Sequence, residues 1–303
     1  MPANIREIKG RMKAVKNIQR ITKTMQLIAT ARFQTLQQKA TQAHAYADRI
    51  KAMVGEVVSS INEEEIQRPL RRKTEAGDAG RTLMLVLTSD RGLCGSYNTT
   101  LMRVVQQRLK AGLPPEQRRL EIVGKKGVGY AKFNHIDIDE AHLDFGETPK
   151  YADIAAMADR FMDAFAAGTY DRVVVAYTKF VSMGTQTPEL LTLLPLEKPT
   201  AEPGSEGAEA EPGRRGGEAN YEFDPGAEAL LSELLPVTVR VTLQRCFNDA
   251  VVSEQLARMV AMKAATDAAS KQGKSLKREF NRARQTAITT ELSEIIAGAA
   301  ALE

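Results

Sequence analysis

The chain contains no tryptophan, and the aromatic residues together make up 5% of its 303 residues. Proteins that bind single-stranded nucleic acid stack bases on aromatic side chains, so this scarcity argues against that class. Cysteine is also scarce: Cys94 and Cys246 lie far apart and form no metal-binding or redox motif. Two free thiols in a chain of this size indicate a reducing compartment.

Long apolar runs are missing as well. The run IIAGAAAL near the C-terminal end is far shorter than the ~20 residues that a membrane span requires. Charged side chains occur from Arg6 onward, so no secretory signal is expected at the N-terminus.

Both ends of the chain have little proline and glycine. Glycine is absent between Gly10 and Gly55, and from Ser253 onward there is no proline. Helix-favouring residues dominate both stretches. We therefore expect two helices much longer than the ~8–20 residues of typical globular helices.

Each predicted helix carries one narrow apolar stripe with alternating spacings of three and four, as in coiled coils. The N-terminal stripe is expected at Ile5, Ile8, Met12, Val15, Ile18, Ile21 and Met25, and after a shift of register at Phe33, Leu36, Ala40, Ala43, Ala47, Ile50, Val54, Val57 and Ile61. The C-terminal stripe is expected at Leu276, Phe280, Ala283, Ala287, Ile288, Leu292, Ile295, Ala299 and Leu302. These patterns predict an antiparallel two-helix shaft; two ordinary helices of a bundle are the alternative.

Acidic residues are nearly missing from both shaft helices. In the first forty residues Glu7 is the only acid among the bases Arg6, Lys9, Arg11, Lys13, Lys16, Arg20, Lys23, Arg32 and Lys39. The C-terminal helix has the same bias, although the net charge of the whole chain is only +4. A field of one sign along a rod predicts an acidic partner, either nucleic acid or an acidic protein surface.

The middle of the chain predicts a small α/β domain. Strands are expected at residues 82–90, 120–123 and 172–177, and helices after Asn98, as a possible cap, and at 152–166. The predicted fold class is a long antiparallel coiled coil plus a small Rossmann-like α/β domain with a mainly parallel sheet. The predicted divisions are 1–62 (N-terminal helix), 81–196 (α/β domain), 197–224 (low-complexity insertion and foot) and 225–303 (C-terminal helix).

No catalytic, cofactor-binding or metal site is predicted in that domain. The loop at residues 89–96 lacks GxGxxG, and Gly124, Gly127 and Gly129 lack the spacing of a phosphate-binding loop. Tight turns explain these glycines better. A reactive Cys94 is disfavoured because no histidine is close in sequence. His135, Asp137 and Asp139 would share one strand face, but a solvated edge strand is preferred to a metal site.

Two further segments stand out. Residues 197–226 are rich in proline, glycine and glutamate up to Gly217 and predict a mobile surface insertion. The stretch Val237–Leu243 alternates apolar and polar residues, a pattern typical of a strand.

Four segments, in order along the chain, resemble the γ subunit of F-type ATP synthases. They are IKGRMKAVKNIQRITKTMQLIATARF, LTSDRGLCGSYN, SEQLARMVAMKAATDAA and FNRARQTAITTELSEIIAGAAAL. Ala268 stands where the family has asparagine. The resemblance implies a helix at Val237–Leu243, against the strand pattern. The insertion has no cysteine where chloroplast relatives carry a regulatory pair, so control by thiols is not expected.

The resemblance implies a central rotor stalk that performs no bond chemistry and needs no cofactor. Its partners would be the hexamer of alternating α and β subunits, the ε subunit and the membrane c-ring, and not nucleic acid. Proton-driven rotation of the ring would turn the shaft and drive the catalytic β subunits through their conformations. The implied location is the cytoplasmic face of the bacterial inner membrane, as a peripheral protein.

The resemblance also implies contact residues. Lys23, Met25 and Arg258 match the shaft segment that faces acidic β-subunit loops. Arg284, Gln285 and Thr289 match residues that touch a β-subunit loop near the top. Ile295 and Leu302 belong to the expected tip in an apolar bearing, and Tyr221 belongs to the foot beside the c-ring and the ε subunit.

Two other classes of function fit parts of the sequence. The basic helices alone are compatible with a coiled-coil nucleic-acid-binding or scaffold protein, which a steep salt dependence of DNA binding would reveal. A small α/β enzyme with helical arms would need a site that the sequence does not contain.

Overall fold

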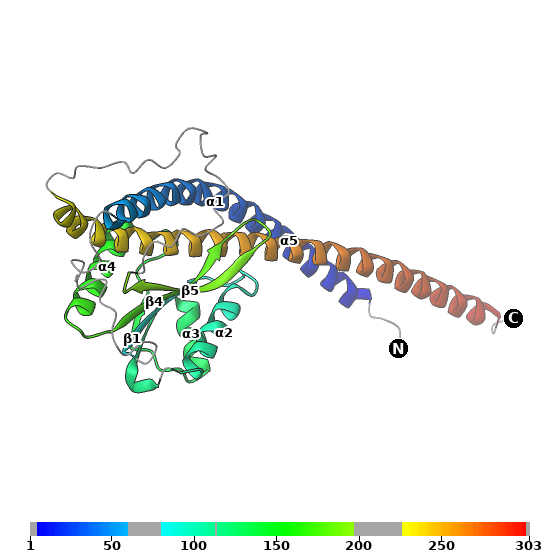
Figure 1. Cartoon of the computed structure of the whole chain (residues 1–303). Helices are drawn as coiled ribbons and strands as arrows, with labels where there is room; N and C mark the ends of the chain where they lie inside the picture. Colours follow the sequence, from blue (N-terminus) through cyan, green and yellow to red (C-terminus); the bar gives the residue numbers. More distant parts are fainter. Residues whose placement is uncertain (1–4, 60–79, 113, 197–225, 301–303) are drawn as a thin grey trace. The chain divides into compact units, whose positions relative to one another are not determined.

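The computed structural model of the chain describes residues 5–59, 80–112, 114–196 and 226–300. Two long helices, α1 (Ile5–Ser59) and α5 (Ala227–Ala300), begin and end this part of the chain (Figure 1). An α/β segment lies between them in sequence. The expected insertion at 197–224 and the end of the first expected helix, residues 60–62, lie outside the described residues.

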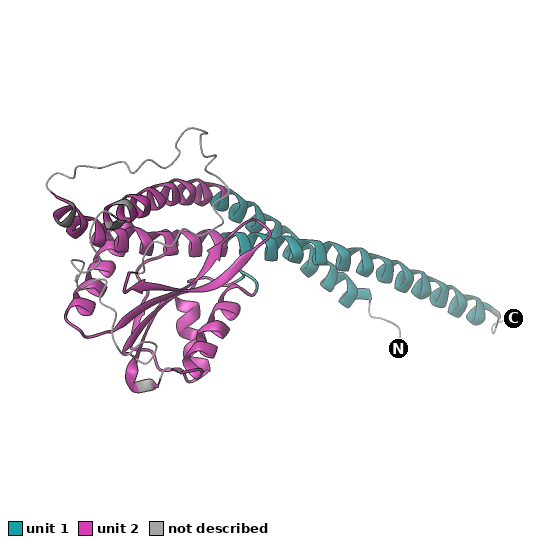
Figure 2. Ribbon diagram, viewed as in Figure 1, with its two compact units in different colours: residues 1–33, 93–95, 255–303 teal, residues 34–92, 96–254 magenta. Residues whose placement is uncertain are grey.

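The chain divides into two compact units (Figure 2). Unit 1 comprises residues 1–33, 93–95 and 255–303, and unit 2 comprises residues 34–92 and 96–254. Both long helices contribute to both units, so the shaft and the α/β domain share the same two helices.

The sheet of unit 2 has five strands in the order β3-β2-β1-β4-β5. The strands are β1 (Thr82–Leu87), β2 (Arg118–Val123), β3 (Glu140–His142), β4 (Arg172–Phe180) and β5 (Gln186–Leu194). The first four run parallel, and β5 pairs antiparallel with β4. The predicted mainly parallel sheet is confirmed, and the apolar run TLMLVL forms the central strand, buried at every position.

Helices cover both faces of the sheet, which explains its continuous apolar strands. Alternate β1 side chains, Met84 and Val86, pack with α2 (Tyr97–Lys110) and α3 (Lys125–Phe133). Leu83, Leu85 and Leu87 pack on the opposite face with α4 (Tyr151–Ala166) and with α5.

The first part of α5 packs on two sides, against the sheet and against α1. Val239 and Leu243 are buried against the sheet, while Leu231 and Leu235 pack against Ile50, Val54 and Val57 of α1. A helix buried on two sides needs no single apolar stripe. This is why Val237–Leu243 resembles a strand in sequence although it is helical, as the family resemblance implied.

Unit 1 contains the antiparallel helix pair. Thr266 Oγ1 donates a hydrogen bond to Thr22 Oγ1 over 2.8 Å, and Gly273 lies against Val15, with a Cβ built on it 3.8 Å from Val15 Cγ1. Residue 22 of α1 therefore pairs with residue 266 of α5, and residue 15 with residue 273, so the two helices run antiparallel. An apolar cluster of Ile8, Val15, Ala269 and Leu276 continues the same pairing.

The buried stripe of α1 differs from the expected one in its first part. Ile18 and Ile21 are 52% and 56% exposed, so their placement in the helix seam was wrong. The buried positions are instead Ile8, Val15, Thr22, Ala29, Phe33 and Ala40. These positions follow a single heptad register, so no shift of register is needed. Polar Thr22 fits in the seam because its hydroxyl oxygen accepts a hydrogen bond from Thr266 there.

Two local expectations in the α/β domain were also wrong. Asn98 does not cap α2 but lies inside it, where its side-chain amide accepts from Ser89 N (3.0 Å) and donates to Ser89 Oγ (2.8 Å). The stretch from His135 to Asp139 is not a strand: the edge strand β3 begins at Glu140. Asp139 instead accepts from Leu120 N (2.7 Å) and Arg119 Nη1 (3.1 Å).

Glu121 is an acid buried in the sheet. Burial alone would raise the pKa of its carboxyl, but hydrogen bonds from His142 and Arg160 outweigh burial and lower the pKa below its ordinary value of 4.5. His142 Nε2 lies 2.8 Å from Glu121 Oε2, and Arg160 Nη1 lies 3.1 Å from Glu121 Oε1. The ionised form of Glu121 is therefore the one that the fold stabilises.

This arrangement predicts sensitivity to acid. A folded-state pKa below the unfolded value means that the stabilisation is complete above the unfolded pKa and is lost as pH falls through the folded pKa. We expect the free energy of unfolding to fall as the pH is lowered through and below 4.5, the ordinary pKa of the carboxyl, and to fall less steeply in Glu121→Gln. Chemical denaturation across that range measures both slopes. Equal slopes for wild type and Glu121→Gln would contradict the prediction, and Glu116→Gln, at an exposed position, is the control.

Candidate functional site: partner-binding surfaces

The loop after β1 is the place where related folds bind phosphates, but here it caps a helix. The first backbone amides of α3 are occupied by that loop: Lys125 N donates to Asp90 Oδ1 (3.1 Å), Lys126 N to Ser89 O (3.0 Å) and Gly127 N to Thr88 Oγ1 (3.0 Å). A phosphate would have to displace these bonds. The glycines of this region therefore have a structural role.

Gly127 allows α3 to approach the sheet. A Cβ at this position would lie 2.5 Å from Thr88 Oγ1 and 2.7 Å from Ile122 Cγ2. Gly124, which precedes the helix with φ of 96°, is equally constrained by Thr88 O at 2.3 Å. Both glycines are required by close packing and backbone conformation, not by a ligand.

Two glycines of the same helix provide a matched test. Gly127→Ala should lower the free energy of unfolding by about 1–3 kcal/mol, because overpacking forces neighbouring groups apart. Gly129, with nothing within 4 Å of an added Cβ, should tolerate alanine or gain up to about 1 kcal/mol of helix propensity. Urea denaturation followed by circular dichroism measures both. A Gly127→Ala variant as stable as Gly129→Ala would contradict the packing argument.

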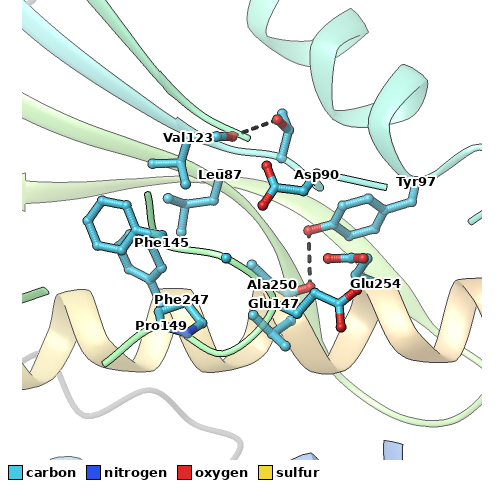
Figure 3. Close-up of a pocket in the computed structure, with 13 residues that line it drawn as sticks. Leu87, Asp90, Tyr97, Val123, Phe145, Glu147, Pro149, Phe247, Ala250 and Glu254 are labelled. Atoms are coloured by element: carbon cyan, nitrogen blue, oxygen red, sulfur yellow. Dashed lines mark hydrogen bonds between the residues drawn. The ribbon is translucent and has the colours of Figure 1, made fainter. Parts of the chain in front are cut away.

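A small pocket lies between the ends of β1 and β2 and helix α5 (Figure 3). Its volume is about 30 Å³, enough for one or two water molecules and too small for a nucleotide. Tyr97 closes one side by donating its hydroxyl proton to Ala250 O (3.0 Å), and Asp90, Glu147 and Glu254 line the rim. Glu147 is already paired with Arg91 at 2.7 Å. This pocket gives no support to an enzyme active site.

The cysteines are also unsuited to chemistry. Cys94 and Cys246 are buried, and burial together with nearby Asp249 raises the pKa of the Cys246 thiol far above neutral pH. The neutral thiol is the unreactive form.

The surfaces of the two paired helices in unit 1 are better candidates for a binding site. All the basic residues of α1 in unit 1 that are described are exposed, including Lys9, Lys13, Arg20 and Lys23. On α5 the exposed bases are Lys263, Lys271, Lys274, Lys277, Arg278, Arg282 and Arg284. Exposed bases outnumber exposed acids on both helices, so the surface of the pair is mainly positive and suited to an acidic partner.

Three predicted shaft contacts have different settings. Lys23 is exposed, and Met25 is partly buried on the same helix. Arg258 is only 8% exposed and interacts within the chain. Of these three side chains, Lys23 is therefore the most exposed and Arg258 the most buried.

A second apolar stripe lies on the surface of α1. Ile18, Ile21 and Ile28 are 52%, 56% and 50% exposed, and Met25 continues the spacing. Sequence reasoning assigned Ile18 and Ile21 to the seam and therefore missed this surface. The signal that could have revealed it is the heptad spacing from Val15 to Thr22 and Ala29, which leaves these isoleucines on another face.

The last part of α5 also has an exposed apolar stripe. Beyond Ala283, Ile288, Leu292, Ile295 and Ile296 are between 56% and 69% exposed. The pairing of α1 with α5 reaches the first described residue of α1, Ile5, near this point. Arg284, Gln285 and Thr289 are exposed beside the stripe, and Thr289 Oγ1 donates to Gln285 O (2.9 Å). Leu302 and Tyr221 lie outside the described residues.

No helix of the described ranges is long and apolar enough to cross a membrane.

Comparison with known proteins gives a consistent result. The model of the family described as ATP synthase matches residues 4–302. The ATP synthase gamma chain of Rhodopirellula baltica is 40% identical over 304 residues, covering 99% of this chain and 99% of that protein. The ATP synthase gamma chain of Heliobacterium modesticaldum is 36% identical over 298 residues, covering 98% and 99%.

Solved structures share the fold. A chain in the cryo-EM structure of the Euglena gracilis mitochondrial ATP synthase, OSCP/F1/c-ring, in rotational state 3 has a TM-score of 0.64 and 18% identity, covering 98% of this chain and 94% of that chain. A chain of the Tetrahymena thermophila mitochondrial ATP synthase central stalk/c-ring has a TM-score of 0.56 and 20% identity, covering 81% and 99%.

Proposed function

The chain belongs to the family of ATP synthase gamma chains, and we propose that it is the rotating central stalk that couples proton-driven rotation of a membrane ring to ATP synthesis. The observation that carries the proposal is the helix pair of unit 1, whose C-terminal helix continues beyond the described residues of α1 with an exposed apolar stripe at Ile288, Leu292, Ile295 and Ile296. Exposed apolar stripes of this kind mark protein interfaces. A sleeve formed by the α and β subunits would cover it.

In this mechanism the chain acts mechanically. Unit 1 is not symmetric around its axis, because α1 presents exposed isoleucines and bases and α5 presents mainly bases and the apolar tip. As the shaft turns, each β subunit would face a different side of it in succession. The differing contacts would favour a different conformation of each β subunit, as a ligand shifts a population by binding one state better.

The proposed chain is not itself catalytic. The β1 loop caps α3, the pocket at the end of the sheet holds only water-sized groups, and both thiols are buried. The nucleotide chemistry would belong to the β subunits, and this chain would need no cofactor.

The proposed partners follow from the two kinds of surface. The basic surface with Lys23, and with Arg284, Gln285 and Thr289 nearer the tip, would face acidic loops of the β subunits. Ile295 and Leu302 would lie in the apolar sleeve, and the region of Tyr221 would meet the ε subunit and the c-ring. We place the chain at the cytoplasmic face of a bacterial inner membrane, as a peripheral protein attached through those partners.

Lys23 provides a test of the electrostatic contact. Lys23→Ala should lower the rate of proton-driven ATP synthesis about two- to fivefold, since an exposed ion pair contributes about 0.5–1 kcal/mol. The yield of assembled complex should stay unchanged. Lys39→Ala, an exposed base on the same helix but outside the segment that resembles the family motif, is the control. Equal synthesis rates for Lys23→Ala and Lys39→Ala in reconstituted vesicles would refute the contact.

The proposal as a whole is tested by reconstitution. The chain, co-expressed with the α, β and ε subunits of its own complex, should co-purify with them. When joined to the membrane sector in vesicles, the complex should make ATP in response to a proton gradient. A hexamer that couples synthesis to the gradient without this chain would overturn the proposal.

A further inference from the structure

Three potential metal ligands gather at the edge of the sheet, on β2 and β3. Glu121 is aligned with Glu140, and Val123 with His142, in the parallel register. Because alternate residues of a strand share a face, Glu121, Glu140 and His142 lie on the same side of the sheet. One ligand atom from each residue lies within 4.8 Å of the other two.

The spacing is close to what a metal ion needs. Zinc bonds to nitrogen and carboxylate oxygen are about 2.0–2.2 Å long, so two ligands of one ion can lie up to roughly 4 Å apart. The cluster therefore has to contract by less than about 1 Å to close around an ion. The Glu140 side chain is 50% exposed and can rotate to achieve this.

The carboxylate oxygens are arranged in an inner and an outer set. The inner oxygens face different nitrogens of the imidazole: Glu121 Oε2 lies 2.8 Å from His142 Nε2, and Glu140 Oε1 lies 3.7 Å from His142 Nδ1. Since a metal ion binds one of these nitrogens, the half-exposed Glu140 side chain has to rotate toward Nε2 before both carboxylates can share the ion. Arg160 Nη1, from α4, donates to the outer oxygens, Glu121 Oε1 (3.1 Å) and Glu140 Oε2 (2.9 Å). Of the Arg160 bonds, only that from Nη2 to Glu121 Oε2 competes for an inner oxygen.

We propose that Glu121, Glu140 and His142 form a binding site for a divalent transition-metal ion such as Zn²⁺, and that Arg160 orients the two carboxylates from outside. Groups that hydrogen-bond to metal ligands and fix their orientation are a general feature of metal sites. The ring of Phe145 meets the His142 ring edge-on, at 6.2 Å between centroids and 84°, and limits its rotation.

The ligand set selects the kind of ion. An imidazole nitrogen with two carboxylates suits Zn²⁺ and its first-row neighbours, whereas Mg²⁺ and Ca²⁺ prefer sites made of oxygen alone. A bound ion would join β2 to β3, the three-residue edge strand. The site is independent of the proposed rotor function, since it uses no residue of unit 1.

Calorimetric titration of the full purified chain tests the site. Zn²⁺ should bind at one equivalent per chain with a Kd tighter than about 100 µM. His142→Gln and Glu140→Gln should each weaken binding roughly tenfold or more. His135→Gln, which removes an exposed histidine from the same region, should bind Zn²⁺ like wild type. Co²⁺ should give visible absorption bands in wild type and not in His142→Gln.

Melting curves provide a second readout. Zn²⁺ should raise the Tm of wild type by mass action and leave the Tm of His142→Gln unchanged, while excess Mg²⁺ should do neither. Glu140→Gln changes a half-exposed side chain, so it keeps the test valid if His142→Gln fails to fold. Absence of Zn²⁺ binding to wild type, binding unaffected in Glu140→Gln, or equal loss in His135→Gln would each overturn the proposal.

Discussion

Leu292→Asp combined with Ile295→Asp should reduce the yield of assembled complex by about 100-fold or more. The two side chains are 56% and 69% exposed in the chain alone, and burying a large aliphatic side chain contributes about 1.5–3 kcal/mol. Losing both removes about 3–6 kcal/mol from the interface, equivalent to a factor of roughly 100 or more in affinity. Burying the new carboxylates without partners adds to the cost.

The opposite face of the same helix segment provides the control. Thr290 and Ser293 are exposed and lie away from the apolar stripe, with their hydroxyls donating to the backbone oxygens of Thr286 and Thr289. Thr290→Asp with Ser293→Asp introduces the same two negative charges in the same helix segment. This pair should assemble with at least near-normal yield, and Leu292→Met with Ile295→Met should also be tolerated. If the complexes carrying the stripe and control aspartate pairs assembled equally well, the tip of α5 would lie in water and the proposed apolar sleeve around it would be wrong.

Leu276→Ala should lower the free energy of unfolding by about 2–5 kcal/mol, the range for a large-to-small change in a packed core. Leu276 is 7% exposed and packs with Ile8, Val15 and Ala269 between the two helices of unit 1. The buried residues Thr22, Thr266 and Ala269, which follow along the seam, have small side chains. Loss of this contact should therefore separate the helices at their ends.

Lys277, the next residue, is exposed and gives the matched substitution. Lys277→Ala should change the free energy of unfolding by no more than about 0.5 kcal/mol. Urea denaturation of the isolated chain, followed by helical circular dichroism, compares the two variants. Equal midpoints for Leu276→Ala and Lys277→Ala would show that this seam does not hold the shaft together.

The sequence was most informative where one physical signal dominated. Long stretches with little glycine and proline predicted both helices, and the apolar run of β1 predicted a strand buried on both faces. The exposed stripe of α5 was predictable because Ile288, Leu292 and Ile295 recur at spacings of four and three near the end of the helix.

Prediction failed where the decisive partner was distant in sequence. On α1, the stripe through Ile18 and Ile21 is more apolar than the true seam through Thr22, and only the α5 hydroxyl of Thr266 makes Thr22 suitable for burial. The strand β5 was not predicted: it contains Pro188 and depends on pairing with β4 at the edge of the sheet.

Prediction from sequence failed for the same reason at helix α3 and at the cluster around Glu121. The sequence KKGVGY is rich in glycine and was interpreted as a turn, but the loop after β1 supplies bonds to its first amides. Glu121 has no local partner in sequence, since His142 and Arg160 approach it from β3 and α4. Such contacts require the folded topology and cannot be inferred from spacing alone.

Direct observation of rotation tests the central claim most closely. Both native cysteines are buried, so Phe133→Cys, at a position 84% exposed, offers a specific site for attaching a probe. In a surface-fixed hexamer of α and β subunits containing this variant, ATP hydrolysis should turn the probe stepwise in one direction. A probe that stays still, or only fluctuates, while the same complexes hydrolyse ATP would contradict the account.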